Sequence, residues 1–165
     1  AVVSNFEIAC RLEARGVQTT VGMNPGGTVE VAGVSVSMVR ADHSSSFAPD
    51  ESGRSDYGGV AAGLMIRPPG GEMVYHAGDT ALFGEMRDFA DLYAPTMAFL
   101  PIGDRFTMGP EQAAIACRWL QLRKMVPIHW GTFSMLTGTP AALKAALAES
   151  GTACEVVEVE PGVGF

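Results

Sequence analysis

The sequence predicts an α/β fold, and three observations indicate this class. The chain has 165 residues, 47% of them hydrophobic, which is enough for a substantial core in one domain. Its 20 glycines and 10 prolines divide it into short segments separated by turns. In the second half, apolar strand-like runs alternate with segments of helical periodicity, which is typical of layered α/β proteins.

The first part of the chain predicts one helix, three strands and a long loop. Residues 4–16 have helical spacing, with Ser4 as the N-cap, Glu7 completing a capping box and Gly16 ending the helix. Residues 44–59 form a loop rich in Ser, Pro, Asp and Gly, and loops of this length often line functional sites. Alternating or β-branched residues predict strands at 17–21, 28–31 and 34–39.

The remainder predicts a β-hairpin followed by alternating strands and helices. The turn Pro68-Pro69-Gly70-Gly71 separates two strands, at 60–67 and 72–76. Helices are then expected at 84–90, 110–122 and 140–149, and strands at 97–102, 125–128 and 153–159. No internal repeat, low-complexity tract or linker interrupts the sequence, so one domain is expected.

Charge and composition argue against several kinds of partner and location. The formal net charge of −7 disfavours nucleic acid and anionic membrane surfaces as partners. No apolar run approaches the roughly 20 residues of a membrane span, and no signal peptide is visible. Cys10, Cys117 and Cys154 are far apart and lack CxxC spacing, so we expect reduced, mostly buried thiols in a cytoplasmic protein.

Three polar side chains each follow the end of a predicted strand. They are His43, Asp79 and His129, and if their strands lie side by side, they meet at one edge of a sheet. Two imidazoles and one carboxylate form a site suited to Zn²⁺, Mn²⁺ or Fe. Taken singly, Asp79 could equally well cap the turn that follows it, and either histidine could be an ordinary hydrogen-bonded residue.

Two further polar residues lie near this predicted site. His76 precedes Asp79 by three positions, and we expect it either to support a ligand or substrate, or to be a hydrogen-bonded residue at a strand end. Asp104 follows the strand at 97–102 and is expected either to support the site or to cap its own loop. The serines at 44–46 offer hydroxyl nucleophiles, but no base is placed to activate them.

Four segments carry a resemblance to a known family. They are Val-Tyr-His-Ala-Gly-Asp-Thr at 74–80, Phe-Leu-Pro-Ile-Gly-Asp at 99–104, Phe-Thr-Met-Gly-Pro-Glu at 106–111 and Val-Pro-Ile-His at 126–129. Together they resemble the metallo-β-lactamase superfamily, and more narrowly its bacterial metal-dependent hydrolases, over essentially the whole chain. The resemblance implies a metallo-β-lactamase-like αββα sandwich with two divalent metal ions at the edge between the sheets. Zinc is expected first, with manganese or iron as alternatives.

The resemblance also implies roles for the three strand-end residues. His43 and His129 each correspond to a ligand of one ion, and Asp79 corresponds to the ligand that bridges both. The His-x-His-x-Asp-His signature of the superfamily is absent, because the chain has only three histidines, none of them in that pattern. Residues 1–165 are therefore expected to form a single domain, incomplete at the N-terminus, that lacks the first strands and the first metal motif.

We therefore expect the complete protein to be a metal-dependent hydrolase that uses a metal-activated water, with Asp79 and His129 as catalytic residues. Its substrate would be a small lactone, ester, amide or phosphodiester. This chain alone is expected to be inactive, because catalytic zinc normally has three protein ligands. Its open sheet face would be covered by the missing segment or by another chain, giving a homo-oligomer. The competing hypothesis is a metal-poor half-domain that acts only as an association partner.

Overall fold

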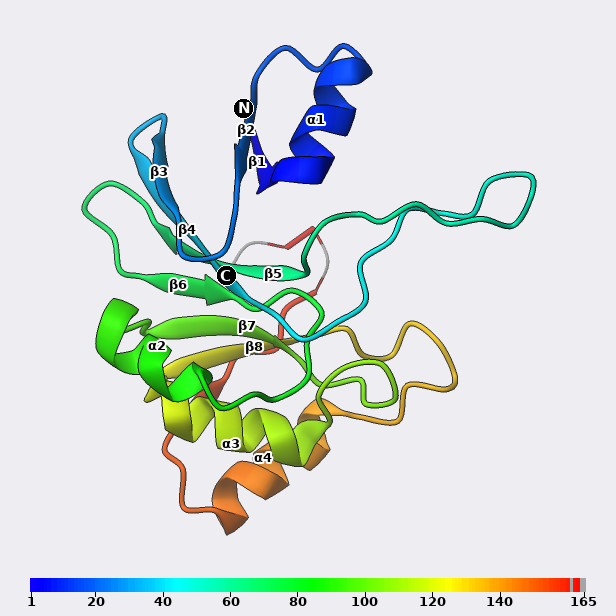
Figure 1. The fold of residues 1–165 in the computed structure, drawn as a ribbon. Coiled ribbons are helices and arrows are strands. Elements are labelled where there is room, and N and C mark those ends of the chain that lie inside the picture. Colours follow the sequence, from blue (N-terminus) through cyan, green and yellow to red (C-terminus); the bar gives the residue numbers. More distant parts are fainter. Residues whose placement is uncertain (161, 164–165) are drawn as a thin grey trace.

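The structure, a computed structural model, describes residues 1–160 and 162–163. The chain begins with a βαβ unit, in which strands β1 and β2 pair in parallel around one helix (Figure 1). Its elements are β1 (Val2–Asn5), α1 (Phe6–Ala14) and β2 (Thr20–Met23). This unit forms a small sheet of its own, separate from the main sheet of the protein.

The start of α1 differs from the prediction. Asn5 is the N-cap, and its Oδ1 accepts a hydrogen bond of 2.9 Å from the backbone N of Ile8. The predicted capping box between Ser4 and Glu7 is wrong, because Ser4 lies in β1 and pairs with Gly22. A strand of four residues that runs directly into a helix is too short to show a clear two-residue period.

The remaining strands form one seven-stranded sheet in the order β3-β4-β5-β6-β7-β8-β9. Their bounds are β3 (Thr28–Val31), β4 (Val34–Arg40), β5 (Ala62–Arg67), β6 (Val74–His76), β7 (Met97–Pro101), β8 (Lys124–Ile128) and β9 (Glu155–Val156). Neighbouring strands are antiparallel from β3 to β6 and parallel from β6 to β9. Strands β4, β6, β7 and β8 therefore run in the same direction, and their carboxyl ends lie at one edge of the sheet.

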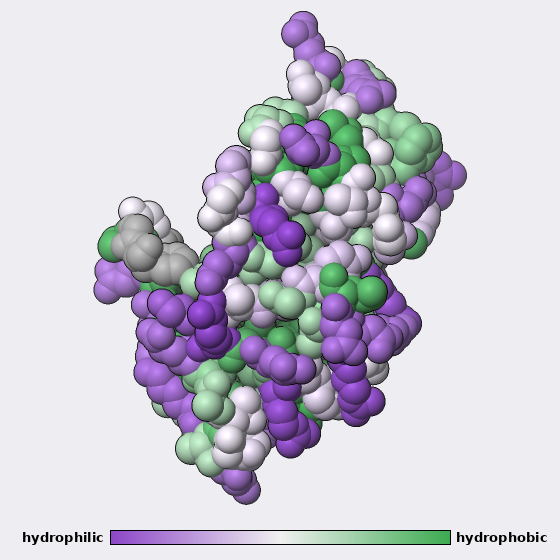
Figure 2. All heavy atoms as spheres, turned by 90° about the vertical axis from the view of Figure 1, so that its left-hand side faces the viewer, coloured by the Kyte–Doolittle hydropathy of each residue, from purple (hydrophilic) through white to green (hydrophobic). Residues whose placement is uncertain are grey.

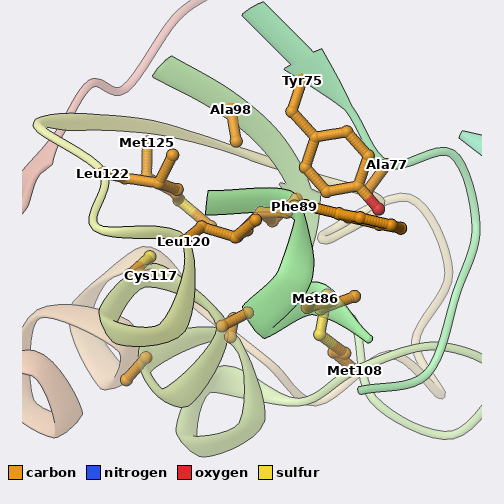
Figure 3. Packing of buried hydrophobic residues seen from close by; sticks show 14 of the residues in the cluster. Tyr75, Ala77, Met86, Phe89, Ala98, Met108, Cys117, Leu120, Leu122 and Met125 are labelled. Atoms are coloured by element: carbon orange, nitrogen blue, oxygen red, sulfur yellow. The ribbon is translucent and has the colours of Figure 1, made fainter. Parts of the chain in front are cut away.

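Helices α2 (Met86–Tyr93), α3 (Pro110–Leu120) and α4 (Pro140–Glu149) lie on the same side of this sheet (Figure 1). They bury a core in which Met65, Tyr75, Ala98 and Met125, which are register partners on adjacent strands, are all 0% exposed. Figure 3 shows Tyr75, Ala98 and Met125 pointing towards the side chains of α2 and α3. The predicted α/β class is confirmed.

The opposite face of the large sheet is less covered. The βαβ unit lies over its β4 side (Figure 1), where Met38 is only 2% exposed. Further along this face, Leu64, Ile66, Val74 and Phe99 are partly exposed apolar residues. Figure 2, which views the molecule from the left of Figure 1, shows hydrophobic patches among hydrophilic residues on that side.

Most differences from the predicted elements are shifts of their ends. The helix predicted at 84–90 begins at Met86 and continues to Tyr93. The helix predicted at 110–122 ends at Leu120, because Gln121 adopts a left-handed φ of 54°. Helix α4 has the predicted bounds. The predicted strands at 17–21, 60–67, 72–76 and 153–159 begin two or three residues late, and the last shrinks to two residues. Among the described residues, no helix is both long and apolar enough to cross a membrane.

Candidate metal centre

The three strand-end residues of the predicted site follow strands whose carboxyl ends share one edge of the large sheet. His43 follows β4, Asp79 follows β6 and His129 follows β8 directly. Two hydrogen bonds join the first two loops. The N of Asp42 donates to Oγ1 of Thr80 at 2.9 Å, and the N of Ala81 donates to the carbonyl of Asp42 at 3.0 Å. The fold thus assembles this edge from segments that are far apart in the sequence.

Asp79 and His129 are brought together at this edge. Nε2 of His129 lies 3.4 Å from Oδ2 of Asp79, and the two side chains are 26% and 46% exposed. Two donors that each bind a tetrahedral zinc ion at about 2.0–2.1 Å stand about 3.4 Å apart. The separation of these two atoms therefore equals the spacing of two ligands on one ion, and the pair is open to solvent.

The backbone at His129 is strained and closely packed. Its φ of 54° is left-handed, which is uncommon for a residue with a side chain. A Cβ added at Gly103 would lie 2.0 Å from the carbonyl oxygen of His129 and 3.0 Å from its Nδ1, so only glycine fits there. Nδ1 itself is buried and has no hydrogen-bond partner among the described residues. On its Nδ1 side, surrounding packing and not a hydrogen bond positions this imidazole.

His43 does not join Asp79 and His129 in a three-donor group. Its Nδ1 lies 2.9 Å from the carbonyl oxygen of Ser44, and its side chain is exposed. Within residues 1–160 and 162–163, no three His, Cys, Asp or Glu side chains are arranged to hold a metal ion. The role of His43 as a metal ligand therefore stays a prediction.

A pocket of about 430 Å³ opens beside His43. The long loop between β4 and β5 forms much of its wall, including Tyr57 and Val60, which are 63% and 41% exposed. Arg40 also lines the pocket, but it pairs with Asp42 at 2.9 Å and with Glu85. The pocket thus combines apolar and aromatic surface with a cation that already has two carboxylate partners.

Asn5, which the sequence analysis missed, holds this loop against the βαβ unit. The Asn5 side chain is 6% exposed, and its Nδ2 donates to the carbonyl oxygens of Gly58 at 2.8 Å and Val60 at 3.0 Å. The same side chain caps α1, so one residue fixes both a helix start and a pocket wall. Its position directly before the helical pattern was the available signal, but Ser4 offered an equally good cap.

His76 lies at the end of β6, where its Nδ1 accepts a hydrogen bond of 3.1 Å from the backbone N of Gly78. In its neutral form the ring therefore carries its proton on Nε2. The ring stacks on Phe99 with centroids 5.5 Å apart. Partial desolvation lowers the pKa of His76, although the charge of Asp79 opposes the shift. These contacts favour a neutral His76 that can donate from Nε2.

Asp104 is a loop residue with a left-handed φ of 63°. Its backbone N donates to the carbonyl of Met108 at 3.0 Å, and its Oδ2 accepts from Oγ1 of Thr137 at 3.3 Å. The backbone contact closes the loop that carries Asp104, whereas the side-chain contact joins it to a second loop. A supporting role towards the metal pair stays a prediction.

Comparisons with known proteins show which sequences and folds this chain resembles. A family model described as the Beta-lactamase superfamily domain matches residues 2–130. A protein of Rubrobacter xylanophilus named "UPF0173 metal-dependent hydrolase" is 44% identical over 98% of this chain and 66% of its own length. A protein of the same name from Solibacter usitatus is 45% identical over 98% of this chain and 68% of its own length.

A solved structure extends the similarity to three dimensions. Igni18 of Ignicoccus hospitalis, described as a novel metallo hydrolase, is 36% identical and superimposes with a TM-score of 0.83. The superposition covers 98% of this chain and 66% of Igni18. The chain thus spans about two thirds of the length of the relatives it matches.

Proposed function

Because the chain belongs to the metallo-β-lactamase superfamily, among relatives named metal-dependent hydrolases, we propose that it carries part of the active site of such a hydrolase. The observation that supports this most directly is the 3.4 Å separation of Asp79 Oδ2 and His129 Nε2. We propose Asp79 as the ligand shared by two divalent ions, with His129 on one ion and His43 on the other. Bound metal would lower the pKa of a water and so supply hydroxide at neutral pH.

The two paired donors fit such an ion in kind and spacing, but not in number. A carboxylate and an imidazole are ligands that zinc, manganese and iron all accept. The described residues supply no group of three donors, so further ligands would come from outside this set. Zinc is proposed first because 3.4 Å corresponds to two ligands of a tetrahedral ion.

We propose that the substrate is an uncharged carbonyl compound, such as a lactone, ester or amide. The pocket beside His43 is walled by Tyr57, Val60 and other apolar groups, and its cation Arg40 is paired. Hydrogen bonding to Asp42, together with the charges of Asp42 and Glu85, raises the pKa of Arg40. The two carboxylates offset the charge of this guanidinium, so the pocket offers no net positive charge to an anionic group. The net charge of −7 also disfavours a phosphodiester.

The residues around the pair would orient the substrate. His76 is proposed as a hydrogen-bond donor to a substrate or ligand oxygen, because Gly78 occupies its Nδ1 and leaves the proton on Nε2. Asp104 is proposed to steady the loop after β7 through its contacts with Met108 and Thr137. Asn5 would hold the loop that forms the pocket wall.

We propose that further polypeptide covers the less buried face of the large sheet. Partly exposed apolar residues, such as Leu64, Ile66 and Phe99, favour a covered face over a solvated one. A longer chain, as in the relatives, or a second copy of this chain would cover that face. Sedimentation would separate a monomer from an oligomer, and a compact monomer that binds no hydrophobic dye would contradict this proposal.

The competing hypothesis of an association half-domain is not favoured, because the similar proteins are named hydrolases. The expectation that residues 1–165 alone are inactive gains no support from the comparisons either. Activity should therefore be measured on this chain and on the chain preceded by a His-x-His-x-Asp-His segment. Metal content, measured on both, separates a failure to bind metal from a failure of catalysis.

The proposal is tested by metal-dependent hydrolysis of matched substrates. An uncharged aryl ester and a lactone should be hydrolysed in the presence of Zn²⁺, more slowly after chelation, and a bis-aryl phosphodiester should be the poorest substrate. His129→Ala should abolish the metal-dependent rate, whereas Glu72→Gln at the opposite sheet edge should preserve it. Equal metal-dependent rates for wild type and His129→Ala would overturn the proposed site.

A further inference from the structure

Five of the nine large hydrophobic side chains that are exposed in the described part of the chain lie in loops at the candidate metal edge. Tyr57 and Val60 wall the pocket described above. Phe106, Phe133 and Met135 are 53%, 62% and 45% exposed and belong to two other loops, which follow β7 and β8. Single exposed apolar residues are common on protein surfaces, but several at one edge indicate a binding surface.

The loop that follows β7 lies between the two residues of the metal pair. In the sheet, β7 stands between β6, which Asp79 follows, and β8, which His129 follows. The backbone N of Met108 donates to the carbonyl of the residue after Asp79 at 3.0 Å. At the start of the loop, a Cβ added at Gly103 would lie 3.0 Å from Nδ1 of His129. The loop is therefore held against the segments that carry both members of the pair.

This loop carries Phe106 at its tip. The backbone N of Asp104 donates to the carbonyl of Met108 at 3.0 Å, which closes the loop with Phe106 in its middle. Asp104 and Arg105 have left-handed φ values of 63° and 58°, and strain of this kind persists mainly at functional sites. Met108 is 0% exposed and anchors the loop. Phe106 is two residues from that anchor, a separation that an extended chain spans in at most about 7 Å.

The loop that follows β8 is fastened to the loop of Phe106. Oγ1 of Thr137 donates to Oδ2 of Asp104 at 3.3 Å, and the backbone N of Gly138 donates to the carbonyl of Gly103 at 3.4 Å. Figure 1 shows the two loops next to each other at the right of the molecule, where β7 and β8 end. The joined loops carry three exposed apolar side chains, which we call the apolar rim: Phe106, Phe133 and Met135.

We propose that the apolar rim binds the aryl or alkyl group of the substrate, and so selects uncharged carbonyl compounds that carry a bulky apolar group. This inference rests on the proposed function and names the part of the substrate that the rim recognises. A ligand on the rim would lie beside the metal pair, because the loop after β7 contacts the segments of both Asp79 and His129. Further polypeptide has a different surface to cover, the open sheet face at Leu64 and Ile66.

The first experiment does not depend on turnover. Benzophenone is an uncharged diaryl ketone that inserts into nearby C–H bonds on irradiation, and peptide mapping of the full chain should place its label within residues 104–108 or 131–136. Phe106→Ala should reduce this labelling. Leu92→Ala, which removes an apolar side chain that is 71% exposed on α2, is the matched control and should label like the wild type.

Three results of this experiment would overturn the proposal. The first is a label confined to the open sheet face, at Leu64 or Ile66. The second is equal labelling of the rim in the wild type and in Phe106→Ala. The third is labelling of the rim that falls as the protein concentration rises, because a second copy of the chain would then be what covers it. Thermal unfolding of Phe106→Ala confirms that the variant is folded.

The second experiment measures selectivity with two lactones that differ by one aryl group, γ-butyrolactone and γ-phenyl-γ-butyrolactone. In the presence of Zn²⁺, the wild type should prefer the phenyl compound. Phe106→Ala should lower the ratio of kcat/KM between the two lactones by about 10-fold, within the range seen when a pocket loses apolar contacts. Leu92→Ala should keep the ratio, and an unchanged ratio in Phe106→Ala would overturn the proposal.

The two experiments separate a failure of this inference from a failure of the proposed function. If neither lactone is hydrolysed in a metal-dependent way, or if His129→Ala hydrolyses them as fast as the wild type, the proposed function fails. Labelling with benzophenone then still decides whether the rim binds an apolar carbonyl compound. If metal-dependent hydrolysis requires His129 but shows no preference for the phenyl compound, the proposed function stands and this inference fails.

Discussion

The two edges of the large sheet differ in how well their polar groups are satisfied. At the edge where the parallel strands begin, Glu72 accepts from Oγ1 of Thr96 at 2.7 Å and pairs with Arg123. At the edge where they end, His129 has a left-handed backbone and a buried Nδ1 without a partner among the described residues. Strain and unsatisfied polar atoms persist in native proteins mainly where function requires them, so this difference supports the proposal of a site at the second edge.

The distribution of left-handed residues supports the same contrast. Ala32 turns the β3–β4 hairpin, and Ala94 and Gln121 end helices α2 and α3. Asp104 and His129, in contrast, stand in loops at the candidate site and end no helix. Ordinary structural needs explain the first group, whereas the second group lies at the edge where the metal site is proposed.

The largest expected effect is on metal binding. His129→Ala and Asp79→Asn should each weaken the affinity for Zn²⁺ by at least about 100-fold, since each removes a direct ligand and loss of a mere supporting group costs about 10–100-fold. Competition with a chelator of known affinity measures this. Glu72→Gln, at the edge whose polar groups are satisfied, is the matched control and should bind Zn²⁺ like the wild type.

Gly103→Ala should be the most destabilising change at the functional edge. Its Cβ would lie 2.0 Å from the carbonyl oxygen of His129, and relieving such a clash costs about 3 kcal/mol or more of unfolding free energy. Urea unfolding measures this, and the affinity for Zn²⁺ should fall as His129 moves. Gly84→Ala, where nothing lies within 4 Å of the new Cβ, is the control. Equal stabilities would show that the backbone at His129 is not held by this contact.

Asn5→Ala tests whether the loop beside His43 depends on the βαβ unit. It removes a helix cap and leaves the carbonyls of Gly58 and Val60 without their donor, which should cost about 2–3 kcal/mol. Ser4→Ala should stay within about 0.5 kcal/mol of wild type, because Ser4 is not the cap. Thermal unfolding measures the stability of both variants. If Ser4→Ala were the more destabilised of the two, the predicted capping box of Ser4 and Glu7 would be correct after all.

A smaller effect is expected from the titration of His76. Burial lowers its folded pKa below 6.5, so the unfolded chain binds more protons in the pH range just below 6.5. Stability should therefore rise with pH through that range and level off above it. His76→Gln should flatten this part of the profile in urea unfolding at several pH values. A stability that falls as the pH rises from 5 to 7 would contradict the assignment.

The sequence predicted that three polar residues share one edge of the sheet, but not how they are arranged there. Each of His43, Asp79 and His129 follows a strand that the apolar pattern indicated, and parallel strands bring such ends to one edge. The sequence could not show that His43 stands apart from the other two, because that depends on the path of a loop. Nor could it reveal Gly103, whose need for glycine arises from a residue distant in the sequence.

The N-terminal part illustrates a second limit. Strand β1 and the role of Asn5 were missed because pairing with β2 and hydrogen bonds to the loop at 58–60 are contacts between distant segments. Helix α4, whose proline start and glycine stop are local signals, was predicted with the observed bounds. Local signals thus placed elements, whereas non-local contacts decided how the site is held.

The most direct test of the account is the anomalous scattering of zinc in crystals grown with a stoichiometric amount of Zn²⁺. The account predicts a peak about 2.0–2.2 Å from both Oδ2 of Asp79 and Nε2 of His129. Zinc bound at high occupancy elsewhere, with the pair of Asp79 and His129 left free, would contradict it.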